Sequence, residues 1–181
     1  MWISLTRTAK AKLAISWFFF ITGATLGNWA ALLPSVKDEQ DITNGKLGLI
    51  LLAAVGGALI ALPIITYFNN IYGSGRSTVA SGVMMVLFMP LVGVTYNIGI
   101  FVMGVCMLGF VIGCLDVSAN GQAIICEKMT RQPTMGMFHC IYSIGAFSGA
   151  IVGGLIMEHD NITVLKEVVL FSFILLFPGI V

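Results

Sequence analysis

Long apolar stretches separated by short polar breaks fill most of this 181-residue chain. A helix needs roughly 20 apolar residues to cross the hydrocarbon core of a bilayer, which is about 30 Å thick. The most polar breaks are SVKDEQDITNGK, NNIYGSGRS and CEKMTRQPT, and prolines and glycines cluster near several of them. The pattern predicts six membrane-spanning helices, over residues 13–33, 47–68, 78–95, 100–125, 135–157 and 164–181.

The composition supports a membrane protein built only of helices. The chain is 58% hydrophobic and only 9% charged, whereas a soluble domain carries roughly 25% charged residues. We therefore predict an all-α, multi-pass protein whose main surroundings are the lipid bilayer. The net charge is +1 and no basic run is present, so the sequence does not indicate a nucleic-acid partner.

Lysine and arginine predict the orientation in the membrane, because they gather in cytoplasmic loops. Three of them lie at one set of helix ends, namely Lys37, Lys46 and Lys166. Six lie at the other ends, namely Arg7, Lys10, Lys12, Arg76, Lys128 and Arg131. The larger set predicts a cytoplasmic amino terminus. Most acids, including Glu39 and Glu167, fall on the outer side and contribute little to orientation.

The sequence contains none of the common catalytic motifs, so we do not predict an enzyme. A membrane-embedded enzyme or assembly factor would need clustered acids or histidines at one membrane interface, and no such cluster is seen. The four cysteines have no CxxC or Cys/His ligand spacing and lie in or beside apolar segments. We therefore predict no metal site and no cofactor.

Asp116 is the best single pointer to function, because a charge within a membrane-spanning helix is expensive. Asn120 follows it by four residues, so the two side chains share one helix face. Further polar and aromatic residues on the first and fifth predicted helices could line the same cavity, namely Asn28, Trp29, His139 and Tyr142. Together these residues form a candidate site for a substrate or a proton.

Each candidate also has a purely structural interpretation, which the sequence leaves open. Asp116 and Asn120 could pair to fix the packing of helices. His139, near a helix end, could donate to a carbonyl. Asn28 could form an interhelical hydrogen bond, and Trp29 could lie in the aromatic belt at the membrane surface.

Glycines recur every four residues along three predicted helices. They are Gly23 and Gly27, Gly109 and Gly113, and Gly145, Gly149 and Gly153. Small residues let membrane helices approach closely, so these ridges predict helix–helix contacts. Such smooth ridges could also let bundles of helices rock against one another.

Two long stretches resemble a known family of membrane proteins. GNWAALLPSVKDEQDITNGKLGLILLAAVGGALIALPI resembles the first two helices of bacterial transporters of the major facilitator superfamily (MFS). DVSANGQAIICEKMTRQPTMGMFHCIYSIGAFSGAIVGGLI looks like the fourth and fifth helices of its fucose-permease-like and rhizopine-transport-like (MosC-like) branch, where Asp-x-x-x-Asn precedes a Phe-His. The resemblance covers about residues 13–155.

The resemblance implies secondary active transport of a small hydrophilic solute across the bacterial inner membrane. Such transporters alternate between two states in which two six-helix halves rock around a site at the membrane midplane. This chain would be the amino-terminal half, built from two inverted repeats of three helices. Proton coupling through Asp116 would fit this mechanism.

The loop between the second and third helices departs from the superfamily pattern Gly-x-x-x-Asp-Arg-x-Gly-Arg-Arg, which latches the cytoplasmic gate. Gly73 matches it, and Arg76 lies one residue beyond its final basic pair. The positions that do not match are Thr66, Asn70, Ile71, Ser74 and Gly75. The loop thus lacks the acid of the latch and keeps only one base, Arg76, which indicates modified or relaxed gating.

The sequence stops at FPGIV, which is still apolar. We therefore also expect that the chain could be a truncated, non-transporting remnant. It could equally be a half-transporter that needs a second six-helix half or a second copy of itself.

Overall fold

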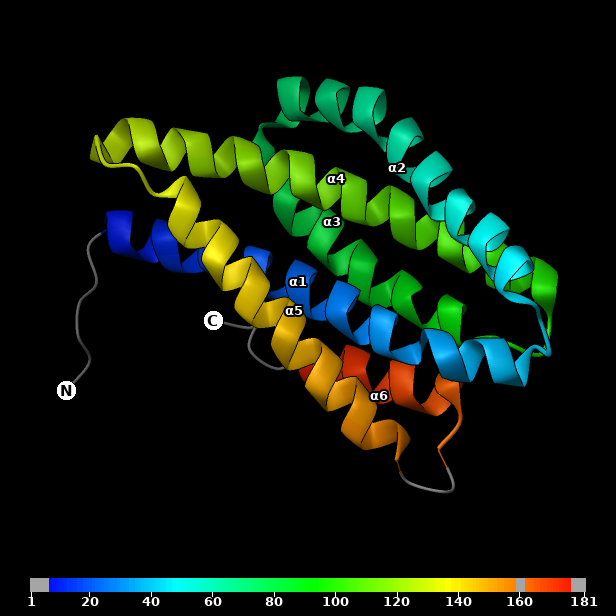
Figure 1. Cartoon of the computed structure of the whole chain (residues 1–181). Coiled ribbons are helices and arrows are strands. Elements are labelled where there is room, and N and C mark those ends of the chain that lie inside the picture. The colour runs from blue at the N-terminus through cyan, green and yellow to red at the C-terminus, as the bar shows by residue number, and fades with distance from the viewer. Residues whose placement is uncertain (1–6, 159–161, 177–181) are drawn as a thin grey trace.

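The computed structural model describes residues 7–158 and 162–176, and this part of the chain is helical. Figure 1 shows the long helices crossing one another in a bundle, with α5 beside α1 and α2 beside α4. The elements are α1 (Arg7–Glu39), α2 (Asn44–Tyr72), α3 (Ser74–Phe88), the 3₁₀ helix η1 (Met89–Gly93), α4 (Ile98–Thr130), α5 (Met135–Met157) and α6 (Val164–Leu176).

Local chemistry explains where several helices begin. The side chain of Thr43 accepts a hydrogen bond from the amide of Lys46 at the start of α2. The Asn97 side chain accepts from the amides of Gly99 and Ile100 at the start of α4. These contacts satisfy amides that have no partner within their own helix.

The helices α2 and α3 meet at Gly73. Its φ of 82° lies in the region that residues with a side chain rarely adopt. A glycine at this position therefore allows α3 to begin directly after α2, with no further loop.

Two predicted helices differ in extent from the structure. The α-helix of α1 continues past Pro34 to Glu39. A proline within a helix removes one backbone hydrogen bond, and membrane helices tolerate this loss. The third predicted span divides, because α3 ends at Phe88 and η1 holds Pro90 in its first turn.

In the described residues, five helical segments are long and apolar enough to cross a membrane: α1, α2, α3 with η1, α4 and α5. The sixth predicted span coincides with α6 over Val164–Leu176, and its remaining residues, 177–181, lie outside the described residues. The described part of the chain is therefore all-helical, and its helices support a multi-pass location in a membrane.

Glycine ridges hold the two closest helix pairs together. In the α1–α5 pair, a Cβ atom at Gly27 would collide with the backbone of Ala146, and one at Gly149 with the backbone of Ala24. The α2–α4 pair repeats this arrangement, with Gly109 against Ala54. The predicted contacts through small residues are confirmed, because only glycine allows such close backbones.

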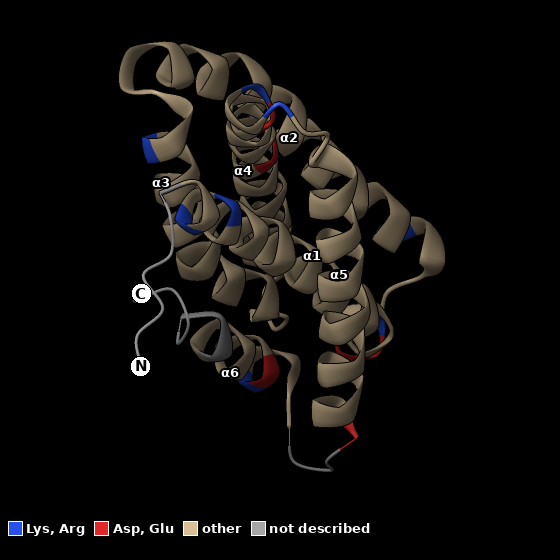
Figure 2. Ribbon diagram, turned by 90° about the vertical axis from the view of Figure 1, so that its left-hand side faces the viewer, with Lys and Arg blue, Asp and Glu red and all other residues tan. Residues whose placement is uncertain are grey.

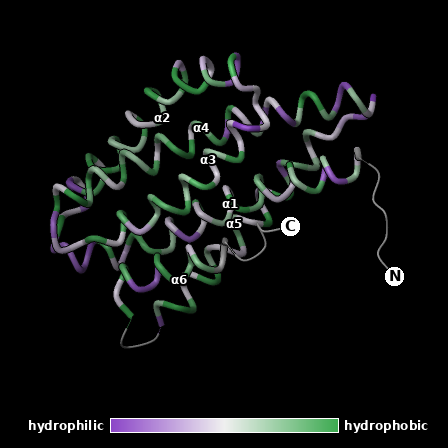
Figure 3. Tube along the Cα trace, turned by 180° about the vertical axis from the view of Figure 1, so that it is seen from behind, coloured by the Kyte–Doolittle hydropathy of each residue, from purple (hydrophilic) through white to green (hydrophobic). Residues whose placement is uncertain are grey.

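The surface of the bundle is strongly apolar. Figure 3 shows hydrophobic residues along most of each helix and hydrophilic ones mainly near the turns. In the apolar stretch of each candidate span, only 22% of the residues of α2 and 17% of those of α5 are buried, against 44–56% in the other spans. These two helices therefore leave most of their apolar side chains to be covered by lipid or by another protein surface.

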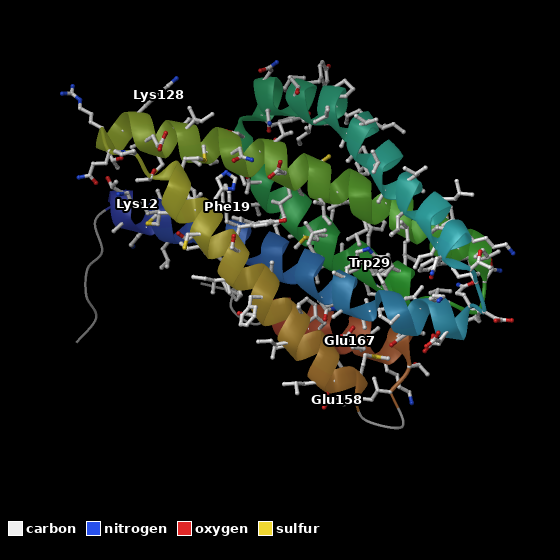
Figure 4. All side chains as sticks on the ribbon, in the orientation of Figure 1. Lys12, Phe19, Trp29, Lys128, Glu158 and Glu167 are labelled. Atoms are coloured by element: carbon white, nitrogen blue, oxygen red, sulfur yellow. The ribbon has the colours of Figure 1, made fainter. Side chains whose placement is uncertain are left out.

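Charged residues are few, and most lie near helix ends (Figure 2). Lys12 and Lys128 lie toward one end of the bundle, and Glu158 and Glu167 lie toward the other (Figure 4). At the second end, Glu39 joins three segments. Its Oε1 accepts from the amide of Val164 at 3.0 Å, and its Oε2 accepts from the Thr95 hydroxyl at 2.6 Å.

Candidate functional site

Asp116 and Asn120 form one polar pair on α4. The Asn120 amide donates to the Asp116 carboxylate at 3.0 Å and to the Asp116 backbone carbonyl at 2.9 Å. The shared helix face predicted from their spacing is confirmed. Asp116 is exposed, although it lies in the middle of a 33-residue helix whose composition suits a membrane. The pair therefore faces away from the packed interior of the bundle.

Two candidate residues on α5 lie on or near the outer surface of the bundle that carries Asp116 and Asn120. Tyr142 is half-buried and lies close enough to Asp116 for the two groups to interact electrostatically. His139 is exposed. Its ring and the ring of Phe19 on α1 pack edge to face, with their centroids 5.4 Å apart. The structure thus brings Asp116, Asn120 and Tyr142 together.

The two candidates on α1 lie inside the bundle instead. Trp29 is buried, with its ring 6.1 Å from that of Phe101 on α4. Asn28 is fully buried, and its amide donates to Oε2 of Glu167 on α6 at 3.3 Å. Neither side chain reaches the exterior on which Asp116 lies.

The predicted gating loop is attached to α4 through uncharged groups. The Ser118 hydroxyl donates to the side-chain oxygen of Asn69 at 3.1 Å. The Gln122 amide donates to the Ser74 hydroxyl at 2.6 Å. Arg76, in the first turn of α3, is exposed. Hydrogen bonds between neutral side chains therefore hold this loop, whereas the superfamily pattern places charges there.

Glu167 is the polar residue that the sequence interpretation missed. The sequence predicts it only as one of several acids on the outer side, yet it is fully buried in the first turn of α6. The available signal is its place next to a run of apolar residues, VVLFSFILL. Its partner Asn28 lies 139 residues earlier, so no local pattern links the two.

Among the described residues, no group of three or more His, Cys, Asp or Glu side chains is placed to hold a metal ion. The polar groups described above are suited to hydrogen bonding with a polar solute and to binding a proton.

Comparison with known proteins identifies relatives over most of this chain. The membrane protein MosC of Rhizobium meliloti is 29% identical over 163 residues, which are 90% of this chain and 40% of MosC. An MFS-type transporter of Yersinia pestis is 30% identical over 132 residues, covering 73% of this chain and 34% of that protein. A transporter of Sinorhizobium fredii is 30% identical over 135 residues, covering 75% and 36%.

These relatives are all longer than this chain, which spans 34–40% of their lengths. No family model matches the sequence, and no solved structure matches it. Two of these relatives are named as transporters and the third as a membrane protein, and five helices of this chain are long and apolar enough to cross a membrane. Over most of its own length, this chain is related to the MFS-type transporters.

Proposed function

We propose that this chain forms the amino-terminal, six-helix half of a secondary transporter in the bacterial inner membrane, with its amino terminus in the cytoplasm. The solute would be small and hydrophilic, such as a sugar or a polyol. The repeated glycine contacts support two inverted repeats, α1–α3 and α4–α6. The first helix of each repeat packs on the second helix of the other.

The exposed carboxylate of Asp116 carries this proposal. A charged side chain at the centre of a membrane helix costs about 2.5–3.5 kcal/mol on insertion scales. The exposed side of α4 around Asp116 is therefore better suited to a water-filled cavity or a protein surface than to lipid. Asn120 and Tyr142 beside it, and His139 on the same helix as Tyr142, would add hydrogen-bonding groups to that cavity.

The cavity would be completed by a second six-helix half. Two observations support this partner. The relatives are two and a half to three times as long as the matched segment, and α2 and α5 are the least covered of the candidate spans. Alternating access needs two halves that rock around a shared site. A second copy of this chain is the other possible source of that half.

Asp116 is proposed to couple transport to protons. A carboxyl group that faces a cavity can release and rebind a proton as the cavity opens to each side. Gly73 and Arg76, at the opposite end of α3 from η1, would contribute to the cytoplasmic gate. Trp29 would support α4 from inside the bundle, through its contact with Phe101.

The test is uptake of labelled monosaccharides and polyols by liposomes under a pH gradient. The liposomes hold either this chain alone or this chain coexpressed with the carboxyl-terminal half of the MosC relative. We expect Asp116→Asn to reduce gradient-driven uptake at least about tenfold, because an asparagine amide cannot release and rebind a proton. Asp38→Asn, which changes an exposed acid at the end of α1, is the matched control.

Two outcomes would argue against parts of the proposal. Unchanged pH dependence in Asp116→Asn would remove this residue from proton coupling. Absence of uptake in every arm would favour the alternative interpretation, a non-transporting remnant of a transporter.

A further inference from the structure

A second polar site lies inside the bundle, apart from Asp116. Glu167 in the first turn of α6 and both Thr25 and Asn28 on α1 have no exposed surface. Figure 4 shows Glu167 beneath α1, toward the end of the bundle opposite Lys12 and Lys128. The hydrogen bond from Nδ2 of Asn28 to Oε2 of Glu167 joins the two helices.

Two oxygen atoms of this pair have no hydrogen-bond partner, Oε1 of Glu167 and Oδ1 of Asn28, and neither has Oγ1 of the buried Thr25 on α1. A carboxylate and an amide carbonyl both accept hydrogen bonds, so they cannot satisfy one another. A proton on Oε1 turns that oxygen into a donor, and Oδ1 of the same asparagine offers the acceptor. Acid and amide would then share two complementary hydrogen bonds.

The packing holds Asn28 in this position. A Cβ atom at residue 153 would collide with Oδ1 of Asn28, so Gly153 on α5 leaves room for the amide. Gly93 of η1 lies against Leu165, in the turn of α6 that carries Glu167. The Asn28–Glu167 pair is therefore enclosed by α1, α5, α6 and η1.

The helices packed against α6 offer Glu167 few charges. η1 has no titratable residue, and Arg76 lies at the far end of α3, where it is exposed. On α5, His139 and Tyr142 lie at least eleven residues from Gly153 along the helix. On α1, Glu39 accepts from the Val164 amide. The other charged groups at this end, among the described residues, are exposed or half-buried: Lys37, Asp38, Asp41, Lys46, Glu158 and Lys166.

Magnitudes favour the neutral form of Glu167. The positive end of the α6 dipole stabilises a carboxylate only modestly. Burial of an ion in a protein costs considerably more, and one neutral amide donor offsets only part of that cost. An enclosed acid with this balance tends to neutralise by taking up a proton.

We propose that Glu167 and Asn28 form a proton-binding site between α6 and α1, in which Glu167 carries the proton on Oε1 and donates it to Oδ1 of Asn28. Binding adds one proton to the carboxylate and breaks no other bond. Release of the proton leaves a buried charge between the two helices and weakens their contact. This site does not depend on solute binding or on the role of Asp116.

The test is infrared spectroscopy of the purified chain in lipid nanodiscs at neutral pH, in H₂O and D₂O. A protonated carboxyl has a C=O band that is separate from the carboxylate bands and shifts in D₂O. We expect this band in the wild-type chain and its loss in Glu167→Gln. Glu158→Gln, which changes an exposed acid at the end of α5, and Asp116→Asn should both keep it.

Three results would overturn the proposal: no such band in the wild-type chain, the same band in Glu167→Gln, or loss of the band when Na⁺ is added at fixed pH. The last result would show that the oxygens of Glu167 and Asn28 bind a cation and not a proton.

If Glu167→Gln does not fold, Asn28→Ala gives a second test. It keeps the carboxyl but removes the acceptor, so the C=O band should move to the frequency of an acid without a hydrogen bond. An unmoved band would exclude the pair with Asn28.

Discussion

Glu127, near the end of α4, caps the start of the next helix. Its Oε1 accepts hydrogen bonds from the amides of Thr134 and Met135 at 2.6 and 2.8 Å. The side chain of Thr134, at the N-cap position of α5, makes no capping hydrogen bond. One carboxylate therefore satisfies two amides at the start of α5 and also lies favourably near the positive end of its dipole.

Glu127→Ala should lower the free energy of unfolding by about 1–3 kcal/mol, because two amides lose a charged acceptor. Glu127→Gln keeps one acceptor oxygen and should lose less. Reversible unfolding in mixed micelles, followed by circular dichroism, measures both values. Lys128→Ala changes an exposed neighbour and serves as the control. Equal losses in Glu127→Ala and Lys128→Ala would contradict the capping role.

At the residue scale, spacing in the sequence predicted only local partners. Asp116 and Asn120 are four residues apart on one helix, so their contact follows from helix geometry. Asn28 was expected beside Asp116, but its amide is used by Glu167. Helix periodicity gives the direction in which a side chain points from the axis of its own helix. The rotation of that helix relative to its neighbours decides which residues the side chain contacts.

At the scale of elements, the glycine ridges set the distance between helices. On α5, Gly149 lies against the backbone of Ala24, whereas Gly154 has no atom within 4 Å of the position that its Cβ would occupy. The two glycines are five residues apart on the same helix. Substitutions at these two glycines therefore separate the effect of crowding the α1–α5 contact from the effect of simply adding a side chain to α5.

Gly149→Leu should destabilise the bundle by about 1–3 kcal/mol or more, because the added side chain overpacks a backbone-to-backbone contact. Gly154→Leu should change stability little. Unfolding in mixed micelles and the yield of monodisperse protein on gel filtration give the comparison. The ridge would lose its proposed role if both variants were equally stable.

The amino-acid pattern predicted the helices better than their ends. Apolar length predicted the five membrane-type helices. The first predicted span ends at residue 33, just before Pro34, but α1 continues to Glu39. The carboxylate of Glu39 then binds Thr95 and the Val164 amide, and these contacts stabilise the extended end. Helix ends thus depend on contacts with segments that are distant in the sequence.

At the scale of the whole molecule, the basic residues divide between the two ends of the bundle. Lys10, Lys12, Lys128 and Arg131 lie at the end that includes the start of α1 and the turn between α4 and α5. Lys37 and Lys46 flank the turn between α1 and α2, at the opposite end. The excess at the first end predicts that it faces the cytoplasm.

Single cysteines can test this orientation in a chain whose four native cysteines are replaced. Asn44→Cys, at the start of α2, should react with a membrane-impermeant maleimide added to intact cells with a permeable outer membrane. Gln132→Cys, in the exposed turn after α4, should react only after the inner membrane is opened. The reverse pattern would show that the amino terminus is outside.

The sequence by itself determined that this chain is a helical membrane protein, and it indicated the relationship to MFS-type transporters. Apolar length and charge content decide whether a segment enters a bilayer, and both are properties of contiguous residues. Only the tertiary structure decided which polar groups are enclosed. Asp116 remained on the exterior, while Glu167 was buried against Asn28 across 139 residues of chain. Burial depends on how whole helices pack, and that packing is a property of the assembled bundle.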